Sequence, residues 1–386
     1  MQNKQGGKFV YDGKRIQPIY ERYAVDFNMP YIYSRFNGTA DPFPIDSNLD
    51  VTSQLIQMRP ASEMHPRESA CTRYVQYCIN KIRSPVCSLC WFPDGKKVLT
   101  GLQSGEITMW NGVTFNFDTI LQAHSQAIKS MKWSRNNRLL LTGDASGVVK
   151  YWNTAMNNLN EVEVHQSPIK DISFSHDDSK FCTACDDATI KIVDVFESEV
   201  ERTLRGHNWD VRKAQFHESM ALIASGGKDN LLKLWDPRES ACLSTFHYHK
   251  NTILSMSFFK ENYLLSGGKD QVVKMLDLRM MKECFTYKDT GDVTALNVSS
   301  NLIFSGNGLG EINYWEEFND EIIATSERRH DNTVWFVEMH PSGHCLVSGA
   351  ADYTIRFWIR PRQQNKEEEK ETQKEEGGTA IPGLLL

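Results

Sequence analysis

The sequence predicts an all-β fold, a seven-bladed β-propeller preceded by an extended, aromatic-rich N-terminal arm, and three observations support this prediction. Three columns of similar residues recur with a period close to 41 residues and align in seven copies. Short segments inside the copies, such as KKVLTG and EITMW, are rich in β-branched or aromatic residues and end at turn residues. No copy shows a sustained helical period, so four short strands per copy are expected.

The clearest column is a strand end that carries tryptophan in five of the seven copies, at steps of 39 to 43 residues. Its members are Trp110, Trp152, Val193, Trp235, Leu276, Trp315 and Trp358. A second column lies nine to ten residues earlier, where a hydroxyl residue precedes Gly or Ala, as in Ser225-Gly226. The period matches WD40-type repeats of about 40–45 residues, and Trp235-Asp236 is a literal WD pair. The pattern therefore indicates a seven-bladed WD40 β-propeller.

A buried polar network is also expected in the blades, because a buried polar group must find a partner. The fourth copy supplies His207, Ser225, Asp229 and Trp235, and the seventh supplies His330, Ser348, Asp352 and Trp358. Partial versions are His165, Thr183 and Asp187 in the third copy and His249, Ser266 and Asp270 in the fifth. In copies one, two and six the aspartate position holds Ser104, Ser146 and Leu309, so these blades are expected to be looser.

Serine, histidine and aspartate are also the residues of a catalytic triad, so a hydrolase is an alternative interpretation. A triad, however, is built once, at one cleft. A set that returns at the blade period is better explained as a structural network, and the sequence predicts no enzyme and no catalytic residue.

Two Cys-x-x-Cys pairs, Cys87/Cys90 and Cys182/Cys185, have spacing that zinc sites use. Both fall in predicted strands, where an offset of three directs side chains to opposite faces. The pairs lie 92 residues apart in sequence, and no Cys or His completes a local site. Buried free thiols are the favoured interpretation, with no metal and no cofactor.

The ends of the ring also follow from the repeat. Copy one begins near Pro85, and the alternating segment from Tyr74 to Ile79 is left over before it. A ring of sheets closes when one terminus lends a strand to the last blade. We therefore expect this segment to be the outer strand of the blade that ends at Trp358, and the propeller to span residues 71–362.

Two segments lie outside the expected ring. Residues 363–386 contain KEEEKETQKEE and no aromatic residue, which predicts a charged, mostly disordered tail. Residues 1–70 form an arm that holds nine aromatic residues between Phe9 and Phe43, with five basic and two acidic residues in the first 22. Rings beside cations suit single-stranded nucleic acid. Docking on protein through the same rings is the alternative.

Composition excludes several other classes. The formal charge of −6 argues against a globally basic nucleic-acid binder but not against a local basic patch. No apolar run approaches the 18–20 residues of a membrane span, so no membrane contact is expected. Nine scattered cysteines without an export signal indicate free thiols in a reducing compartment, the cytosol or the nucleus.

One block goes beyond a generic repeat match. The stretch WNGVTFNFDTILQAH from Trp110 to His124, together with YDGKR at 11–15 and NWDVR at 208–212, closely resembles the WD-repeat subunit of the eukaryotic pre-mRNA cleavage and polyadenylation factor. The resemblance covers the arm and all seven repeats. It implies a nuclear subunit that helps recognise an AAUAAA-type polyadenylation signal. It also implies two protein partners, a CCCH zinc-finger subunit and a large multi-propeller scaffold subunit.

The resemblance also implies which residues contact RNA. The matching positions are Tyr11, Lys14, Arg15, Lys81, Phe117 and Ile120. Tyr11 and Phe117 would stack on bases, Ile120 would close the apolar side, and the three cations would meet phosphates or base edges. Gln17 stands where animal members of the family have an arginine, which puts one cation contact in doubt.

The sequence thus predicts a non-enzymatic RNA-binding and scaffold subunit of the mRNA 3′-end processing complex that does not form a homo-oligomer. The alternative is a generic WD-repeat adaptor without direct RNA contact. The two hypotheses differ on whether Tyr11, Lys14, Lys81 and Phe117 converge on one surface.

Overall fold

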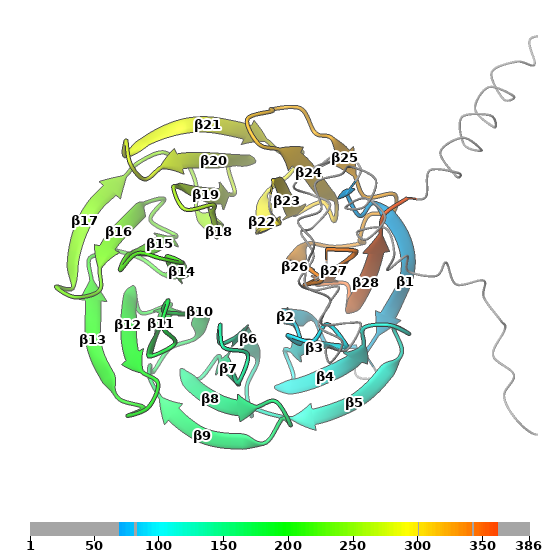
Figure 1. Cartoon of the computed structure of the whole chain (residues 1–386), viewed down its shortest axis with the longest axis horizontal. Helices are drawn as coiled ribbons and strands as arrows, with labels where there is room; N and C mark the ends of the chain where they lie inside the picture. Colours follow the sequence, from blue (N-terminus) through cyan, green and yellow to red (C-terminus); the bar gives the residue numbers. More distant parts are fainter. Residues whose placement is uncertain (1–68, 81–82, 300, 342, 362–386) are drawn as a thin grey trace, which may run out of the picture.

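The computed structural model describes residues 69–80, 83–299, 301–341 and 343–361 of the chain. Twenty-eight strands lie in these residues and form seven four-stranded antiparallel sheets. The sheets stand like blades around a central axis (Figure 1), which confirms the predicted fold class. The innermost strands line a central cavity through residues such as Ser130, Asp171 and Lys213.

The first four blades follow the chain from the inner to the outer strand. Blade one contains β2 (Val86–Trp91), β3 (Lys97–Leu102), β4 (Glu106–Asn111) and β5 (Phe117–Gln122). Blade two contains β6 (Ile128–Trp133), β7 (Leu139–Asp144), β8 (Val148–Asn153) and β9 (Asn158–Glu163). Blade three contains β10 (Ile169–Phe174), β11 (Lys180–Cys185), β12 (Thr189–Asp194) and β13 (Val200–Arg205). Blade four contains β14 (Val211–Phe216), β15 (Ile223–Gly227), β16 (Leu232–Asp236) and β17 (Ala241–Phe246).

The remaining blades complete the ring. Blade five contains β18 (Ile253–Phe259), β19 (Tyr263–Gly268), β20 (Val272–Asp277) and β21 (Lys282–Lys288). Blade six contains β22 (Val293–Ser299), β23 (Leu302–Asn307), β24 (Ile312–Glu316) and β25 (Ala324–Thr325). Blade seven contains β26 (Val334–Met339), β27 (Cys345–Ala350), β28 (Thr354–Ile359) and β1 (Arg73–Ile79). With two residues, β25 is much the shortest outer strand.

The ring closes by the predicted exchange of a strand between the two ends of the propeller. β1 pairs antiparallel with β28, from Arg73 opposite Ile359 to Ile79 opposite Thr354. The first described strand of the chain is therefore the outer strand of the last blade (Figure 1), and the prediction of this closure is confirmed. The closing strand covers what would otherwise be an open edge of β28.

The hydrophobic core lies between neighbouring blades rather than at the centre of the ring. One buried cluster joins Trp91 and Trp110 of blade one to Ile355 and Phe357 of blade seven, so the junction that closes the ring is packed like a domain interior. Among the described residues, no helix is long and apolar enough to cross a membrane.

Candidate functional site

Phe117 and Ile120, two of the predicted RNA contacts, lie on β5, the outer strand of blade one. Phe117 is directly opposite Trp110 in the register, and Ile120 is opposite Thr108. Residues that face each other across two strands point to the same side of the sheet, and so do Trp110 and Thr108, which are two apart. The structure therefore brings Phe117 and Ile120 to one face.

A bulge produces this arrangement. The register shifts so that Phe117 and Thr119 oppose neighbouring residues of β4, which leaves Asp118 between them as the extra residue. A regular strand would direct residues three apart to opposite faces, and one extra residue restores them to the same face. Asp118 is fixed outside the ladder by an ion pair with Lys97 at 2.7 Å. The sequence carried no signal for this bulge.

The face that carries these two side chains adjoins the closure of the ring. The ring of Phe117 lies edge-on to Trp110, with centroids 5.9 Å apart, yet the residue is 43% exposed. Ile120 is 39% exposed. Just before β5, the carbonyl of Phe115 accepts hydrogen bonds from Gln76 (3.3 Å) and Cys78 (3.1 Å) of β1. The blade-one exit is thus in contact with the closing strand.

The other four predicted RNA contacts cannot be placed. Tyr11, Lys14, Arg15 and Lys81 lie outside the described residues. Position 81 follows directly after Asn80, at the end of the closing strand that contacts the blade-one exit.

The predicted polar networks lie inside the blades as continuous chains of hydrogen bonds. In blade four, Trp235 donates its indole N–H to Ser225 Oγ at 2.7 Å, and His207 lies 2.6 Å from the same oxygen and 2.8 Å from Asp229. Blade seven repeats these contacts. Trp358 donates to Ser348 Oγ at 2.8 Å, and His330 lies 2.6 Å from the same oxygen and 3.0 Å from Asp352. The carboxylate can only accept, which fixes the direction of the chain: tryptophan donates to serine, serine to histidine Nε2, and histidine Nδ1 to aspartate.

Blade two completes the network from another position, although Ser146 stands where the repeat places the aspartate. His124 bonds Thr142 at 2.7 Å and Asp144 at 3.1 Å, and Trp152 donates to Thr142 at 2.9 Å. The aspartate comes from two residues earlier than in the other blades, at the end of β7, and it accepts a hydrogen bond from Ser146, the residue at the expected position. Sequence alignment by fixed spacing missed this because a side chain can reach the same point from a neighbouring backbone position.

Blade six contains a different network rather than a degraded one. Asp289 stands where the other blades have histidine, and it accepts hydrogen bonds from Ser305, Asn307 and Asn313. Leu309 does replace the aspartate of the other blades, and Asp289 supplies the carboxylate of this network instead. In blade one, the described residues form only the link from Trp110 to Thr100, at 3.2 Å.

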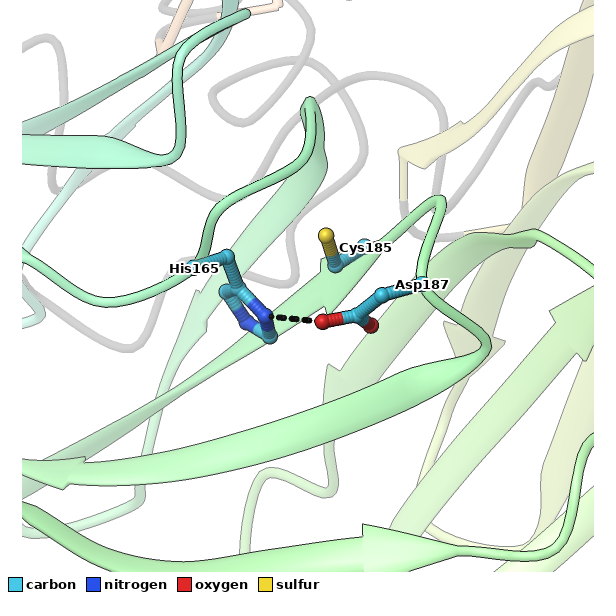
Figure 2. Close-up of side chains that lie close together, drawn as sticks. All are labelled: His165, Cys185 and Asp187. Atoms are coloured by element: carbon cyan, nitrogen blue, oxygen red, sulfur yellow. Dashed lines mark hydrogen bonds and ion pairs between the residues drawn. The ribbon is translucent and has the colours of Figure 1, made fainter.

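One set of potential metal ligands lies within these networks. His165, Cys185 and Asp187 offer ligand atoms within 4.8 Å of one another, and Figure 2 shows the imidazole pointing toward the carboxylate. Both imidazole nitrogens are engaged, with Asp187 at 2.9 Å and Thr183 at 2.8 Å. Burial raises the pKa of the Cys185 thiol to about 12, and the thiol donates to the carbonyl of Ser167. A protonated thiol is a poor metal ligand, so the set is better explained as the network of blade three.

The blade ring and its repeated internal networks define a WD40-repeat β-propeller. Profile comparison agrees: the profile described as "WD domain, G-beta repeat" matches residues 198–236, 240–277 and 323–358. A second profile, described as "IFT140 first beta-propeller", matches residues 71–176.

Among curated proteins, the chain is similar to several that bear the name polyadenylation factor subunit 2. The protein of Neurospora crassa is 37% identical over 80% of this chain and 52% of its own length. That of Yarrowia lipolytica is 34% identical over 92% of this chain and 73% of its own, and that of Schizosaccharomyces pombe is 37% identical over 82% and 68%. The chain belongs to the polyadenylation factor subunit 2 family, which confirms the resemblance seen in the sequence. It spans about half the length of the Neurospora relative.

Proposed function

We propose that this chain is a non-enzymatic RNA-binding and scaffold subunit of the nuclear machinery that cleaves and polyadenylates mRNA. The relatives' name supports the process. The observation that carries RNA contact is the exposed pair Phe117 and Ile120 on one face of β5. An exposed ring offers a stacking surface for any base, and an exposed aliphatic side chain beside it excludes water from one side.

In this proposal the propeller, residues 71–362, is the body on which RNA and partner proteins assemble. Residues 1–70 form the arm that brings Tyr11, Lys14 and Arg15 to the RNA and docks on a partner, and residues 363–386 form a charged tail. Lys81 contributes to the same RNA contact in this proposal, and it follows in sequence the closing strand that contacts the blade-one exit. The partners are the polyadenylation signal, the multi-propeller scaffold subunit and the CCCH zinc-finger subunit.

The test compares Phe117→Ala with Phe117→Tyr in the complex reconstituted with the scaffold and zinc-finger subunits. Loss of one stacking surface should cost about 1–3 kcal/mol of binding to an AAUAAA RNA, and tyrosine should retain most of it. The loss should be smaller for a scrambled hexamer. Because the ring also touches Trp110, the melting temperature of each variant is measured alongside.

Phe196→Ala is the matched control, since Phe196 is 84% exposed at the turn that follows β12 of blade three. Its variant should bind signal RNA like wild type. Wild-type binding by both Phe117→Ala and a Lys14→Ala/Arg15→Ala double variant would contradict the proposal. The chain would then act as a protein-interaction adaptor without direct RNA contact.

A further inference from the structure

An open groove of about 790 Å³ lies at the rim of blade seven, on the other side of the closing strand from Phe117. Its wall on β1 is formed by Tyr77 and Ile79, which alternate with Cys78, the residue that faces blade one. Its other walls come from the segment that follows β25 and from the turn before β28, with Arg328, Arg329 and Tyr353. We refer to it as the blade-seven groove.

The backbone that presents the two arginines is anchored. The Glu327 N–H donates to the carbonyl of Thr72 at 3.1 Å, and the Glu327 carboxylate accepts from the Tyr74 N–H at 3.3 Å. The guanidinium of Arg356 donates to the carbonyls of Arg328 (3.3 Å) and Arg329 (2.6 Å). The segment is therefore held in place through its backbone and the Glu327 carboxylate, and neither contact uses the guanidinium of Arg328 or Arg329.

The groove carries an excess of positive charge. Arg83, Arg328 and Arg329 are exposed, and none of them forms an ion pair among the described residues. The lining also contains Arg356, which forms an ion pair with Asp352 at 3.7 Å. Glu327 and Asp331 are the other two acidic side chains of the lining, and Glu327 keeps its charge while accepting from the Tyr74 N–H. Three exposed arginines against two exposed carboxylates leave the lining with a net charge of +1, which favours a negatively charged ligand.

Exposed rings lie beside this charge. Tyr77 is 54% exposed and Tyr353 is 41% exposed. The guanidinium of Arg328 already lies over the ring of Tyr74, 5.1 Å from its centroid, so the groove has one ordered pairing of arginine with an aromatic ring.

Tyr353 is an aromatic residue at a turn position that every blade repeats. It occupies the last position of the turn between the second and third strands of its blade, with φ of 66°. The same position has positive φ in every blade, and three of the others hold glycine: Gly105, Gly147 and Gly310. Positive φ is unfavourable for a bulky side chain, and an exposed ring gains little from burial. Ala188, Asn230 and Gln271 hold this position in the remaining blades, so Tyr353 differs from its counterparts in carrying an exposed ring rather than in its backbone conformation.

We propose that the blade-seven groove is a second binding site for single-stranded RNA, in which bases stack on Tyr77 and Tyr353 and phosphates pair with Arg83, Arg328 and Arg329. Rings interleaved with cations along an open surface are how proteins hold single strands without reading their sequence. Because β1 separates this groove from the face of Phe117, one RNA strand can cross the closing strand and occupy both. The inference rests on the proposed RNA-binding function and extends its footprint to nucleotides outside the signal.

The test uses the full chain and an oligouridylate of about 15 nucleotides, which lacks the signal hexamer and reports on the groove. Tyr77→Ala should weaken binding about 5- to 100-fold, and Tyr77→Phe, which keeps the ring, should bind within about twofold of wild type. Arg329→Ala should reduce the slope of log affinity against log salt by about 0.7, the value for one phosphate contact.

Tyr353→Gly separates binding from folding. Glycine suits the positive φ, so the melting temperature should stay the same or rise while oligouridylate binding weakens. Phe196→Ala again serves as the exposed-ring control and should change neither quantity.

Wild-type affinity in both Tyr77→Ala and Tyr353→Gly overturns the inference and leaves the groove to a protein segment. A loss of affinity in Tyr353→Gly that comes with a lower melting temperature also counts against it. The proposed signal contact is judged separately, by Phe117→Ala on the AAUAAA RNA. Failure of one site is therefore distinguishable from failure of the other.

Discussion

At the scale of single residues, the carboxylate that accepts a hydrogen bond from the blade histidine comes from different sequence positions in different blades. Asp144 reaches His124 from the end of a strand, whereas Asp187 and Asp229 reach their histidines from the following turn. Burial alone would raise the pKa of Asp144, but hydrogen bonds from His124 and Ser146 outweigh it and lower the pKa to about 2. The carboxylate is therefore ionised at neutral pH and orients the imidazole.

Asp144→Ala should destabilise the protein by about 1–3 kcal/mol, because His124 is buried and would lose the acceptor of its N–H. Ser146→Ala, which removes the residue at the position expected from the repeat, should cost less than about 1 kcal/mol. Urea unfolding of both variants at pH 7 measures the difference. Equal losses would show that the carboxylate of Asp144 is not the main partner of His124.

At the scale of elements, the closing strand is the one strand of the ring that comes from the opposite end of the chain. β1 pairs with β28 along its whole length, and its Cys78 packs with the core shared by blades one and seven. Without β1, the edge of β28 and part of that core would face water, and exposed edges of this kind pair with other chains.

Two truncations isolate the contribution of β1. Deletion of residues 1–68 keeps the strand, whereas deletion of residues 1–80 removes it. The longer deletion should lower the melting temperature by several degrees relative to the shorter one and should aggregate. Scanning calorimetry and light scattering on the pair provide the comparison, and identical melting of the two proteins would rule out a role for β1 in closing the ring.

At the scale of the whole molecule, the junction between blades seven and one contains two buried histidines. The Nε2–H of His340 donates to the carbonyl of Gly95 at 3.1 Å, and the rings of His340 and His344 lie 4.0 Å apart. Burial lowers the pKa of His340 to about 4. Burial also lowers the pKa of His344, and the positive charge of a protonated His340 beside it lowers that pKa further, to about 2. Both rings are therefore neutral in the folded protein at pH 7.

The ring should consequently lose stability in mild acid. Unfolded histidine has a pKa near 6.5, so the contribution of these neutral rings is complete above that pH and is lost as the pH falls toward 4. For His340 alone the loss is about 3 kcal/mol at pH 4. The blade aspartates contribute at lower pH, since the pKa of Asp144 is about 2. Glu338 also titrates between pH 7 and 4.5, because burial raises its pKa to about 7, and its protonation in the folded protein acts in the opposite direction. The histidine contribution is therefore isolated by comparing a histidine variant with wild type.

His340→Gln keeps a donor for Gly95 but does not titrate, so its unfolding free energy should fall less between pH 7 and pH 4.5 than that of wild type. Urea titrations at several pH values measure the slope. A slope equal to that of wild type would mean that the acid sensitivity arises elsewhere, for example at His165 or His330, whose pKa values burial also lowers.

The sequence by itself determined the fold class, the number of blades, the closure of the ring and the family. The fold class and the number of blades follow from residues that recur at a fixed period, such as the tryptophan column, and such a pattern can be recognised in the sequence alone. The closure follows from the strand-like segment from Tyr74 to Ile79 that precedes the first copy. Only the tertiary structure decided three other features: that Asp144 serves blade two, that a bulge at Asp118 brings Phe117 and Ile120 to one face, and that Tyr77, Tyr353 and four arginines share a groove. The physical reason is the same in each case. A hydrogen bond, a bulge and a groove depend on where side chains end in space, and residues far apart in sequence meet there only after the ring has closed.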